Sequence, residues 1–347
     1  MKIEKIELVN FRNYQKKGKE LGQITVVKGD NGAGKSNFME AVYLLAAGKS
    51  FRADVEGEMI MYGETFASIS GITDKGGLRV FLSDGNSGYA KKKFEVNGIA
   101  KRMMDFSGVL KAVLFGPSDM ELITGNPSVR RRYLDLVISQ KEKEYRRCLV
   151  SYEKGLRQRN RLLDRIRDGE AGRNQLFFWD KLLIKNGEYL TLRRQEFLDF
   201  VNQKTRADMI FRLKYDKSVI SEERLKQYAD EEVAAGSTLV GPHRDDFEVE
   251  QENGEPGVYR DISKYGSRGQ QRMAVLWIKL GERDFLTADG ELPLLLLDDV
   301  FSELDHKHRD EVGELVVEQE KNGGQVIMTT ADEHLVPVAD KWHIIKL

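Results

Sequence analysis

Apolar residues in the first hundred positions come in short runs or alternate with polar ones, which is the spacing of β-strands. Five segments have this pattern: residues 3–8, 24–27, 66–70, 78–82 and 93–96. Residues 83–88 and the pair Asn97-Gly98 have turn composition. The pattern predicts a strand-rich first part, and the alternation at the start is that of a half-buried strand and not of a signal peptide.

The pattern changes near Pro117, and from Ser128 to about Glu232 apolar residues recur at helical spacing. Proline is absent from this stretch and glycine is sparse. Six side chains recur at intervals of three, four or seven and share one helix face: Tyr145, Cys148, Tyr152, Leu156, Leu163 and Ile166. The middle of the chain is therefore predicted to be helical.

Glycine-rich α/β character returns at Gly236. The remaining segments with strand composition are residues 238–240, 294–297, 324–330 and, as an edge strand, 342–347. The aliphatic run at 294–297 is typical of a parallel strand buried on both faces. We therefore predict an α/β fold in which residues 1–115 and 236–347 form one domain and residues 116–235 form an inserted, mainly helical lobe.

A glycine-rich loop, Gly29 to Ser36, stands between the apolar run at 24–27 and a helical segment at 38–45. This order of strand, loop and helix is the context of a phosphate-binding loop, whose backbone N–H groups and helix N-terminus hold phosphate. Lys35 is expected to reach the β- and γ-phosphates of ATP, and the Ser36 hydroxyl to ligate Mg²⁺. The expected nucleotide-binding residues are Gly29, Asp30, Asn31, Gly32, Ala33, Gly34, Lys35, Ser36 and Asn37.

Two carboxylates, Asp298 and Asp299, end the aliphatic run at 294–297. Alone, such a pair would indicate only a strand-ending turn. In a parallel sheet that also carries a phosphate loop, it lies at the carboxyl edge beside that loop. Asp298 is then expected to hold Mg²⁺ together with Ser36, and Asp299 to orient or deprotonate the attacking water. Lys35, Asp298 and Asp299 are thus the expected catalytic residues.

Small residues around Ser267 precede a strongly helical segment at 273–280. A serine in this place is commonly only a helix cap. The Ser267 hydroxyl, the Gly269 N–H and the helix dipole could also form a second anion site. Because one ATP site already has its phosphate loop, a second anion site suggests that two chains share each nucleotide, with Ser267, Gly269 and Gln270 acting in trans.

The net charge of −1 gives no overall case for nucleic acid, but charge is unevenly distributed. Residues 130–173 hold 14 Lys/Arg against 7 Asp/Glu. Arginines at four-residue spacing would form a stripe on a helix, either as a solvated face or as a track for DNA phosphates. The candidate DNA-contacting residues are Arg130, Arg131, Arg132, Arg157, Arg161 and Arg165. The first three could instead line an interface of the lobe.

The single cysteine, Cys148, excludes a disulfide within the chain and a four-cysteine metal site. Cytoplasmic residence is expected on this ground. The longest aliphatic run, residues 292–297, contains a proline and is too short to cross a bilayer.

The order of phosphate loop, Ser-Arg-Gly-Gln-Gln-Arg segment and Asp298-Asp299 resembles the ABC-type ATPases. More narrowly, the chain is similar to the RecF family of bacterial DNA repair and replication proteins. The more specific matching segments are Phe11-Arg12-Asn13-Tyr14, Lys49-Ser50-Phe51-Arg52, Phe115-Gly116-Pro117-Ser118-Asp119, Val129 to Asp135, and Val240 to Asp246.

This resemblance implies an ABC-type ATPase core in which ATP drives two copies together head to tail. Ser267 of one copy would close on the γ-phosphate held by Lys35 of the other, and Asp305 would lie near the subunit interface. It also implies binding to duplex and gapped or junction DNA, work with RecO and RecR to load RecA, and slow ATP hydrolysis that times release.

The chain departs from the wider ABC pattern in two places. Asp299 stands where glutamate is common, and Thr329-Thr330 stand where a histidine is expected, with His334 further on. Ser118 and Asp119 lie in the region of the glutamine that usually couples the γ-phosphate to the helical lobe. The alternatives are an SMC-like structural protein, a transporter's nucleotide-binding subunit and a P-loop kinase. The short insertion and the Ser267 segment speak against the first and the last.

Overall fold

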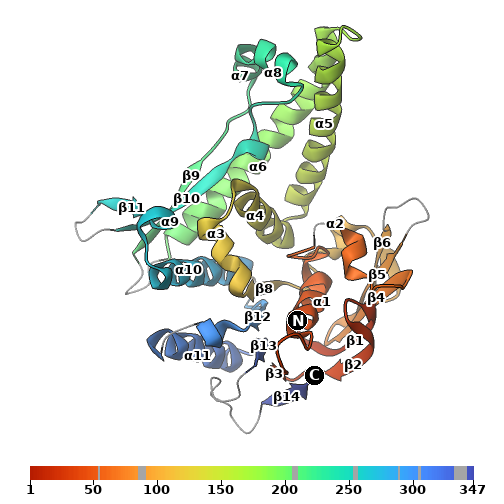
Figure 1. Ribbon diagram of the computed structural model, residues 1–347, viewed down its shortest axis with the longest axis vertical. Helices are drawn as coiled ribbons and strands as arrows, with labels where there is room; N and C mark the ends of the chain where they lie inside the picture. The colour runs from red at the N-terminus through yellow and green to blue at the C-terminus, as the bar shows by residue number, and fades with distance from the viewer. Residues whose placement is uncertain are drawn as a thin grey trace. The chain divides into compact units, whose positions relative to one another are not determined.

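The computed structural model describes residues 1–53, 55–84, 91–204, 210–252, 257–287, 290–303, 306–331 and 342–347. They form two compact units, one made of residues 1–119 and 282–347 and the other of residues 120–281 (Figure 1). No helix in the described residues is both long enough and apolar enough to span a membrane.

A five-stranded sheet with the order β14-β3-β13-β12-β8 forms the centre of the first unit. Its strands are β3 (Ile24–Lys28), β8 (Ala112–Phe115), β12 (Leu294–Asp298), β13 (Val326–Thr330) and β14 (His343–Lys346). All neighbouring pairs are parallel, and β8, β12 and β13 are buried at every position. The predicted buried strands and edge strand are confirmed, whereas β8 had not been predicted. The helices of this unit include α1 (Lys35–Ala47) and α11 (His306–Lys321), with the short turns η2 (Pro117–Met120) and η5 (Val300–Glu303).

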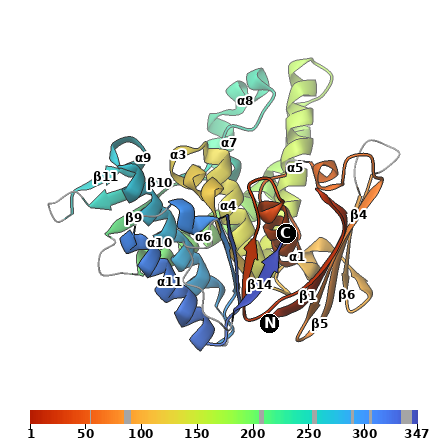
Figure 2. The same ribbon diagram turned by 60° about the horizontal axis from the view of Figure 1, so that its bottom comes forward.

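A second, antiparallel sheet of the first unit has the order β2-β1-β4-β5-β6-β7. Its strands are β1 (Ile3–Phe11), β2 (Tyr14–Glu20), β4 (Phe66–Thr73), β5 (Gly76–Ser83), β6 (Lys91–Val96) and β7 (Ile99–Lys101). Helix α1 packs against one face of this sheet, where Leu45 lies close to Gly71 (Figure 2). Both Asn97 and Gly98 have positive φ, as the turn predicted between β6 and β7 requires. Two short helices, η1 (Glu56–Met59) and α2 (Met103–Phe106), also belong here.

Two long antiparallel helices, α5 (Lys143–Arg167) and α6 (Phe177–Asn202), dominate the second unit. Side chains of the predicted α5 face are buried at Tyr145, Cys148, Tyr152 and Leu163. The shorter helices are α3 (Glu121–Thr124), α4 (Pro127–Lys141), η3 (Arg173–Leu176), α7 (Glu222–Gln227), α8 (Ala229–Ala235), η4 (Pro242–Arg244) and α9 (Ile262–Tyr265). A three-stranded sheet is made of β9 (Phe211–Asp216), β10 (Asp246–Glu252) and β11 (Tyr259–Asp261), and α10 (Arg268–Leu286) follows it.

This unit extends to Gly281, beyond the lobe boundary expected at residue 235. The reason is that β10 pairs with β9, and the Trp277 ring of α10 packs against Phe211 at 5.9 Å while its Nε1 donates to the Lys204 carbonyl. These long-range contacts tie the segment after residue 235 to the helices before it.

The strand expected at residues 238–240 is wrong, because side chains take up the backbone groups there. Thr238 N donates to Asn160 Oδ1 at 2.9 Å, and Leu239 N donates to Glu232 Oε1 at 2.8 Å. A backbone whose donors are satisfied in this way has none left for a strand ladder.

Candidate functional site

The predicted phosphate loop connects the end of β3 to the start of α1. Gly32 and Gly34 have φ of 86° and 107°, values that disfavour any other residue. A Cβ at Gly34 would lie 2.6 Å from Asn13 Nδ2, whereas a Cβ at Gly32 would meet nothing within 4 Å. The loop therefore packs closely against Asn13 at Gly34 and is open at Gly32. An open position is what an anion needs in order to approach the backbone N–H groups.

Lys35 is the first residue of α1 and is only 8% exposed. Its Nζ donates to the Gly29 carbonyl at 2.7 Å and to the Asp30 carbonyl at 3.1 Å. The ammonium group is therefore held across the loop, where a phosphate oxygen could replace one carbonyl as its acceptor. Together with the open backbone at Gly32, this arrangement fits a polyphosphate.

Asp298 is the last residue of β12 and Asp299 follows it, and β12 is separated from β3 only by β13. Thr329 on β13 donates from Oγ1 to Asp298 Oδ1 at 2.7 Å and accepts from the Asp299 backbone N at 2.9 Å. Asp299 has a φ of 52°, an uncommon value for a residue other than glycine. Thr329, noted in the sequence only as a replacement for histidine, thus positions the Asp298 carboxylate and the Asp299 backbone.

Two residues of the segment Arg12-Asn13-Tyr14 hydrogen-bond to backbone carbonyl groups of the phosphate loop. Tyr14 donates its hydroxyl to the Gly34 carbonyl at 3.0 Å, and Asn13 Nδ2 donates to the Ala33 carbonyl at 3.2 Å. Burial raises the pKa of Tyr14 to about 12, so its hydroxyl stays protonated and remains a donor at neutral pH. The sequence indicated a family likeness here but no role.

Glu40 of α1 is fully buried and is the centre of a charged cluster. Its carboxylate accepts from Arg12 Nε at 2.8 Å, from Arg12 NH2 at 2.7 Å and from Ser50 Oγ at 2.6 Å, and lies 3.2 Å from Arg52 Nε. We refer to Glu40, Arg12, Ser50 and Arg52 as the Glu40 cluster. A carboxylate within an otherwise apolar helical segment was the signal that could have revealed it.

Ser267 lies in the second unit, directly before α10. Gln270 N donates to Ser267 Oγ at 3.2 Å, and Ser267 N donates to Gln270 Oε1 at 2.7 Å, so the two residues form a reciprocal capping box. Both residues and Gly269 are exposed. The helix start is therefore pre-formed and accessible, and the capping role considered from the sequence is present.

The six candidate DNA-contacting arginines divide into two groups. Arg130 donates to both carboxylate oxygens of Asp246, at 2.6 and 2.9 Å, and to the Gly125 carbonyl. Arg131 donates to the Asp245 carbonyl, and burial lowers its pKa. Arg132 is half-buried.

Arg157, Arg161 and Arg165 instead lie exposed along α5, where Arg165 also faces Glu170 at 3.7 Å. These three are accessible to a large ligand, whereas Arg130 and Arg131 stabilise the unit itself.

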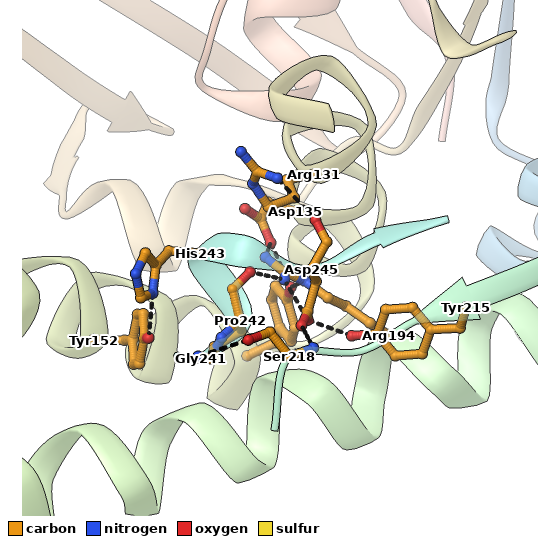
Figure 3. Close-up of polar contacts among 11 residues, drawn as sticks. Arg131, Asp135, Tyr152, Arg194, Tyr215, Ser218, Gly241, Pro242, His243 and Asp245 are labelled. Atoms are coloured by element: carbon orange, nitrogen blue, oxygen red, sulfur yellow. Dashed lines mark hydrogen bonds and ion pairs between the residues drawn. The ribbon is translucent and has the colours of Figure 1, made fainter. Parts of the chain in front are cut away.

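A buried network that the sequence did not predict surrounds Arg194 of α6 (Figure 3). Its guanidinium donates to Asp245 Oδ2 at 3.0 Å, to Asp135 Oδ1 at 2.8 Å and to the Pro242 carbonyl at 2.6 Å. Asp245 also accepts from the Tyr215 hydroxyl and from Ser218 N. This Arg194 cluster joins α4, α6, β9 and the segment before β10, and so gives the Val240–Asp246 motif a structural role.

His243 belongs to the same segment and is held neutral. Its Nδ1 lies 2.8 Å from the Tyr152 hydroxyl and its Nε2 lies 3.0 Å from the Thr238 carbonyl, so Nε2 carries the proton. Burial lowers the pKa of His243 to about 4. Gly241 has a φ of 126°, and a Cβ there would lie 2.3 Å from the Tyr152 hydroxyl, which explains the glycine.

Known proteins share both the sequence pattern and the fold of this chain. The model of the RecF/RecN/SMC N terminal domain matches residues 2–347. The DNA replication and repair protein RecF of Herpetosiphon aurantiacus is 33% identical over 369 residues, covering 96% of this chain and 94% of that protein. The chain belongs to the RecF family. RecF of Agathobacter rectalis is 36% identical and covers 88% of this chain and 86% of its own length.

A solved structure of the recombination mediator protein RecF with ATP, from the RecFOR pathway, has 29% identity and a TM-score of 0.84, covering 97% of this chain and 93% of that one. The predicted ABC-type ATPase fold with its mixed α/β architecture is therefore confirmed for this RecF-family chain. The residues expected in the cis site lie in the first unit, and Ser267, Gly269 and Gln270 lie in the second. Asp305 and His334 lie outside the described residues.

Proposed function

We propose that this chain is an ATP-dependent DNA-binding protein of recombinational repair and replication-fork maintenance, in which ATP joins two copies head to tail. The observation that carries the proposal is the occurrence in one chain of two separate structures that are suited to hold phosphate. One is the loop with Lys35, and the other is the exposed, capped helix start at Ser267.

In the cis site, residues Gly29 to Asn37 would hold the phosphates of ATP, with Lys35 donating to the β- and γ-phosphate oxygens. Ser36 and Asp298 would hold Mg²⁺, which neutralises charge on those oxygens when bound. Asp299 would accept a proton from, or orient, the attacking water. The Thr329 hydrogen bonds that fix Asp298 and Asp299 support these roles.

In the trans site, Ser267, Gly269 and Gln270 of one copy would contact the γ-phosphate bound to the other copy. The capping box leaves the helix N-terminus directed to solvent, and an anion there gains from the helix dipole. Because the shorter Asp299 side chain replaces the common glutamate, we expect slow hydrolysis that times release of the dimer.

DNA would contact Arg157, Arg161 and Arg165, which lie exposed at four-residue spacing along α5. Contacts from such a stripe go to phosphates, so binding would depend on shape and salt more than on sequence. The name of a matched structure places that RecF in the RecFOR pathway. We extend this to RecO and RecR as partners here, with RecA loading on gapped or junction DNA as the outcome.

Sedimentation with and without ATP, and with and without duplex DNA, tests the proposal. The wild type should form a dimer only with ATP, while Ser267→Arg should bind ATP but remain monomeric because the bulky cation blocks the shared site. Ser263→Arg, at an exposed position four residues earlier, is the matched control and should dimerise normally. An ATP-dependent dimer in Ser267→Arg would contradict the shared site.

A further inference from the structure

The face of the six-stranded sheet opposite α1 is covered by no helix in the described part of the chain. Side chains alternate along these strands, so every second residue points to this face. On β4 and β5 those residues include Phe66, Ser68, Arg79 and Phe81. Because Phe66 and Phe81 lie on the solvent side of the sheet, core packing does not explain them.

Phe66 and Phe81 form an offset stack of two nearly parallel rings on this face. Their ring centroids are 5.7 Å apart with an interplanar angle of 18°, and both side chains are half-buried. Arg79 lies with its Cζ 5.9 Å from the Phe81 ring centroid, and its Nε donates to Ser68 Oγ at 3.0 Å. The pair is therefore fixed in a parallel arrangement next to a guanidinium group.

Lysines flank this aromatic pair on the neighbouring strand β6. The register places Lys93 opposite Phe81, and places Lys91 opposite Ser83, which is itself opposite Phe66. Both lysines are exposed, and neither forms an ion pair with any residue that the structure describes. We call Phe66, Phe81, Lys91 and Lys93 the stacking face.

The same row of the sheet continues to a further lysine at its other edge. Lys16 is opposite Val9, which is opposite Ser68, which is opposite Phe81. With strands about 4.8 Å apart, the row from Lys16 to Lys93 spans about 19 Å. This length suits several nucleotides of an extended single strand.

Two acidic residues of this side, Glu7 and Glu95, lie in the next row. Glu7 pairs with Lys5 at 2.7 Å, and Glu95 lies 3.9 Å from Arg79. Their charges are offset by these local partners, so the aromatic row retains its positive charge.

We propose that the stacking face binds single-stranded nucleic acid, with bases stacked on Phe66 and Phe81 and phosphates held by Lys91 and Lys93. Aromatic platforms with flanking cations recognise single strands with little sequence preference, because every base has a flat face. This proposal deepens the DNA-binding part of the proposed function and rests on it. It assigns the single strand to residues separate from the α5 stripe.

Binding to a labelled oligo(dT) and to an abasic oligomer of equal length, each of about 20 nucleotides, separates stacking from phosphate contacts. Fluorescence anisotropy with the full chain should show about 5- to 20-fold tighter binding to oligo(dT). The double variant Phe66→Leu/Phe81→Leu keeps apolar contact across the strands but has no flat face, and should lose this preference. Phe178→Leu, an exposed aromatic of α6, is the control and should retain it.

Lys91→Gln/Lys93→Gln should weaken binding to both oligomers equally and lower the salt dependence by about two charges. Wild type without a preference for oligo(dT), or a leucine double variant that keeps it while remaining folded by circular dichroism, would overturn the proposal. ATP-dependent retention on duplex DNA is measured on the same samples. Loss of this ATP-dependent retention would contradict the ATP-gated dimer, whereas loss of the oligo(dT) preference would contradict the stacking face.

Discussion

The Glu40 cluster and the Arg194 cluster are both buried charge networks, but they are arranged in opposite ways. In the first, one carboxylate receives two arginines beside the phosphate loop. In the second, one arginine receives two aspartates within the helical unit. Arg12 and Arg52 are partly exposed and could turn to water, whereas Asp245 and Arg194 are almost fully buried. We therefore expect the Glu40 cluster to influence ATP binding and the Arg194 cluster to stabilise the fold.

The largest effect should come from Arg194→Met. The substitution leaves Asp245 buried without its cation, and such a loss costs about 3–5 kcal/mol of unfolding free energy. Urea unfolding followed by circular dichroism measures it. Arg193→Met, at a half-exposed neighbour paired with Glu142, should cost no more than about 1 kcal/mol. Equal costs for the two variants would show that the Arg194 cluster does not fix the fold.

A smaller effect is expected from acidification through His243. Its pKa is lowered to about 4 in the folded protein, against about 6.5 when unfolded, so the unfolded state binds more protons between these values. The stability that neutral His243 contributes is complete above pH 6.5 and is lost as the pH falls towards 4, by up to about 3 kcal/mol.

The measurement for His243 is the difference in unfolding free energy between wild type and His243→Gln across this pH range. Other groups titrate in both proteins and cancel in that difference. A difference that does not change with pH would mean that His243 is not held neutral.

The smallest of the three effects should follow Glu40→Gln, which keeps the shape of the side chain and removes its charge. The loss of stability should be about 1–3 kcal/mol, since the two arginines can be partly hydrated. ATP affinity, measured by titration calorimetry, should fall several-fold because α1 and its loop lose an anchor. Glu4→Gln, at an exposed position of β1, is the control. Unchanged ATP affinity in Glu40→Gln would show that the Glu40 cluster does not influence ATP binding.

Features set by residues close in sequence could be predicted from it. The phosphate loop required only a buried strand, glycines and a helix within about 25 residues, and α1, β3 and β12 are present as expected. Within the Arg194 cluster, Arg194 bonds to residues 48 to 59 positions away, so nothing local marks it. The outward row of the six-stranded sheet could not be predicted from the sequence either, because only strand register brings Lys93 next to Phe81.

Thr329 lies on β13, and its Oγ1 contacts two consecutive residues, Asp298 at the end of β12 and Asp299 directly after it. The hydroxyl gives its proton to the side chain of Asp298 and takes one from the backbone of Asp299. In the proposed ATP site, the residue expected to hold Mg²⁺ and the residue expected to orient water would therefore both depend on one oxygen of an adjacent strand. Thr329→Val keeps a similar side-chain volume and is expected to remove both hydrogen bonds at once, freeing the Asp298 carboxylate and the Asp299 backbone together.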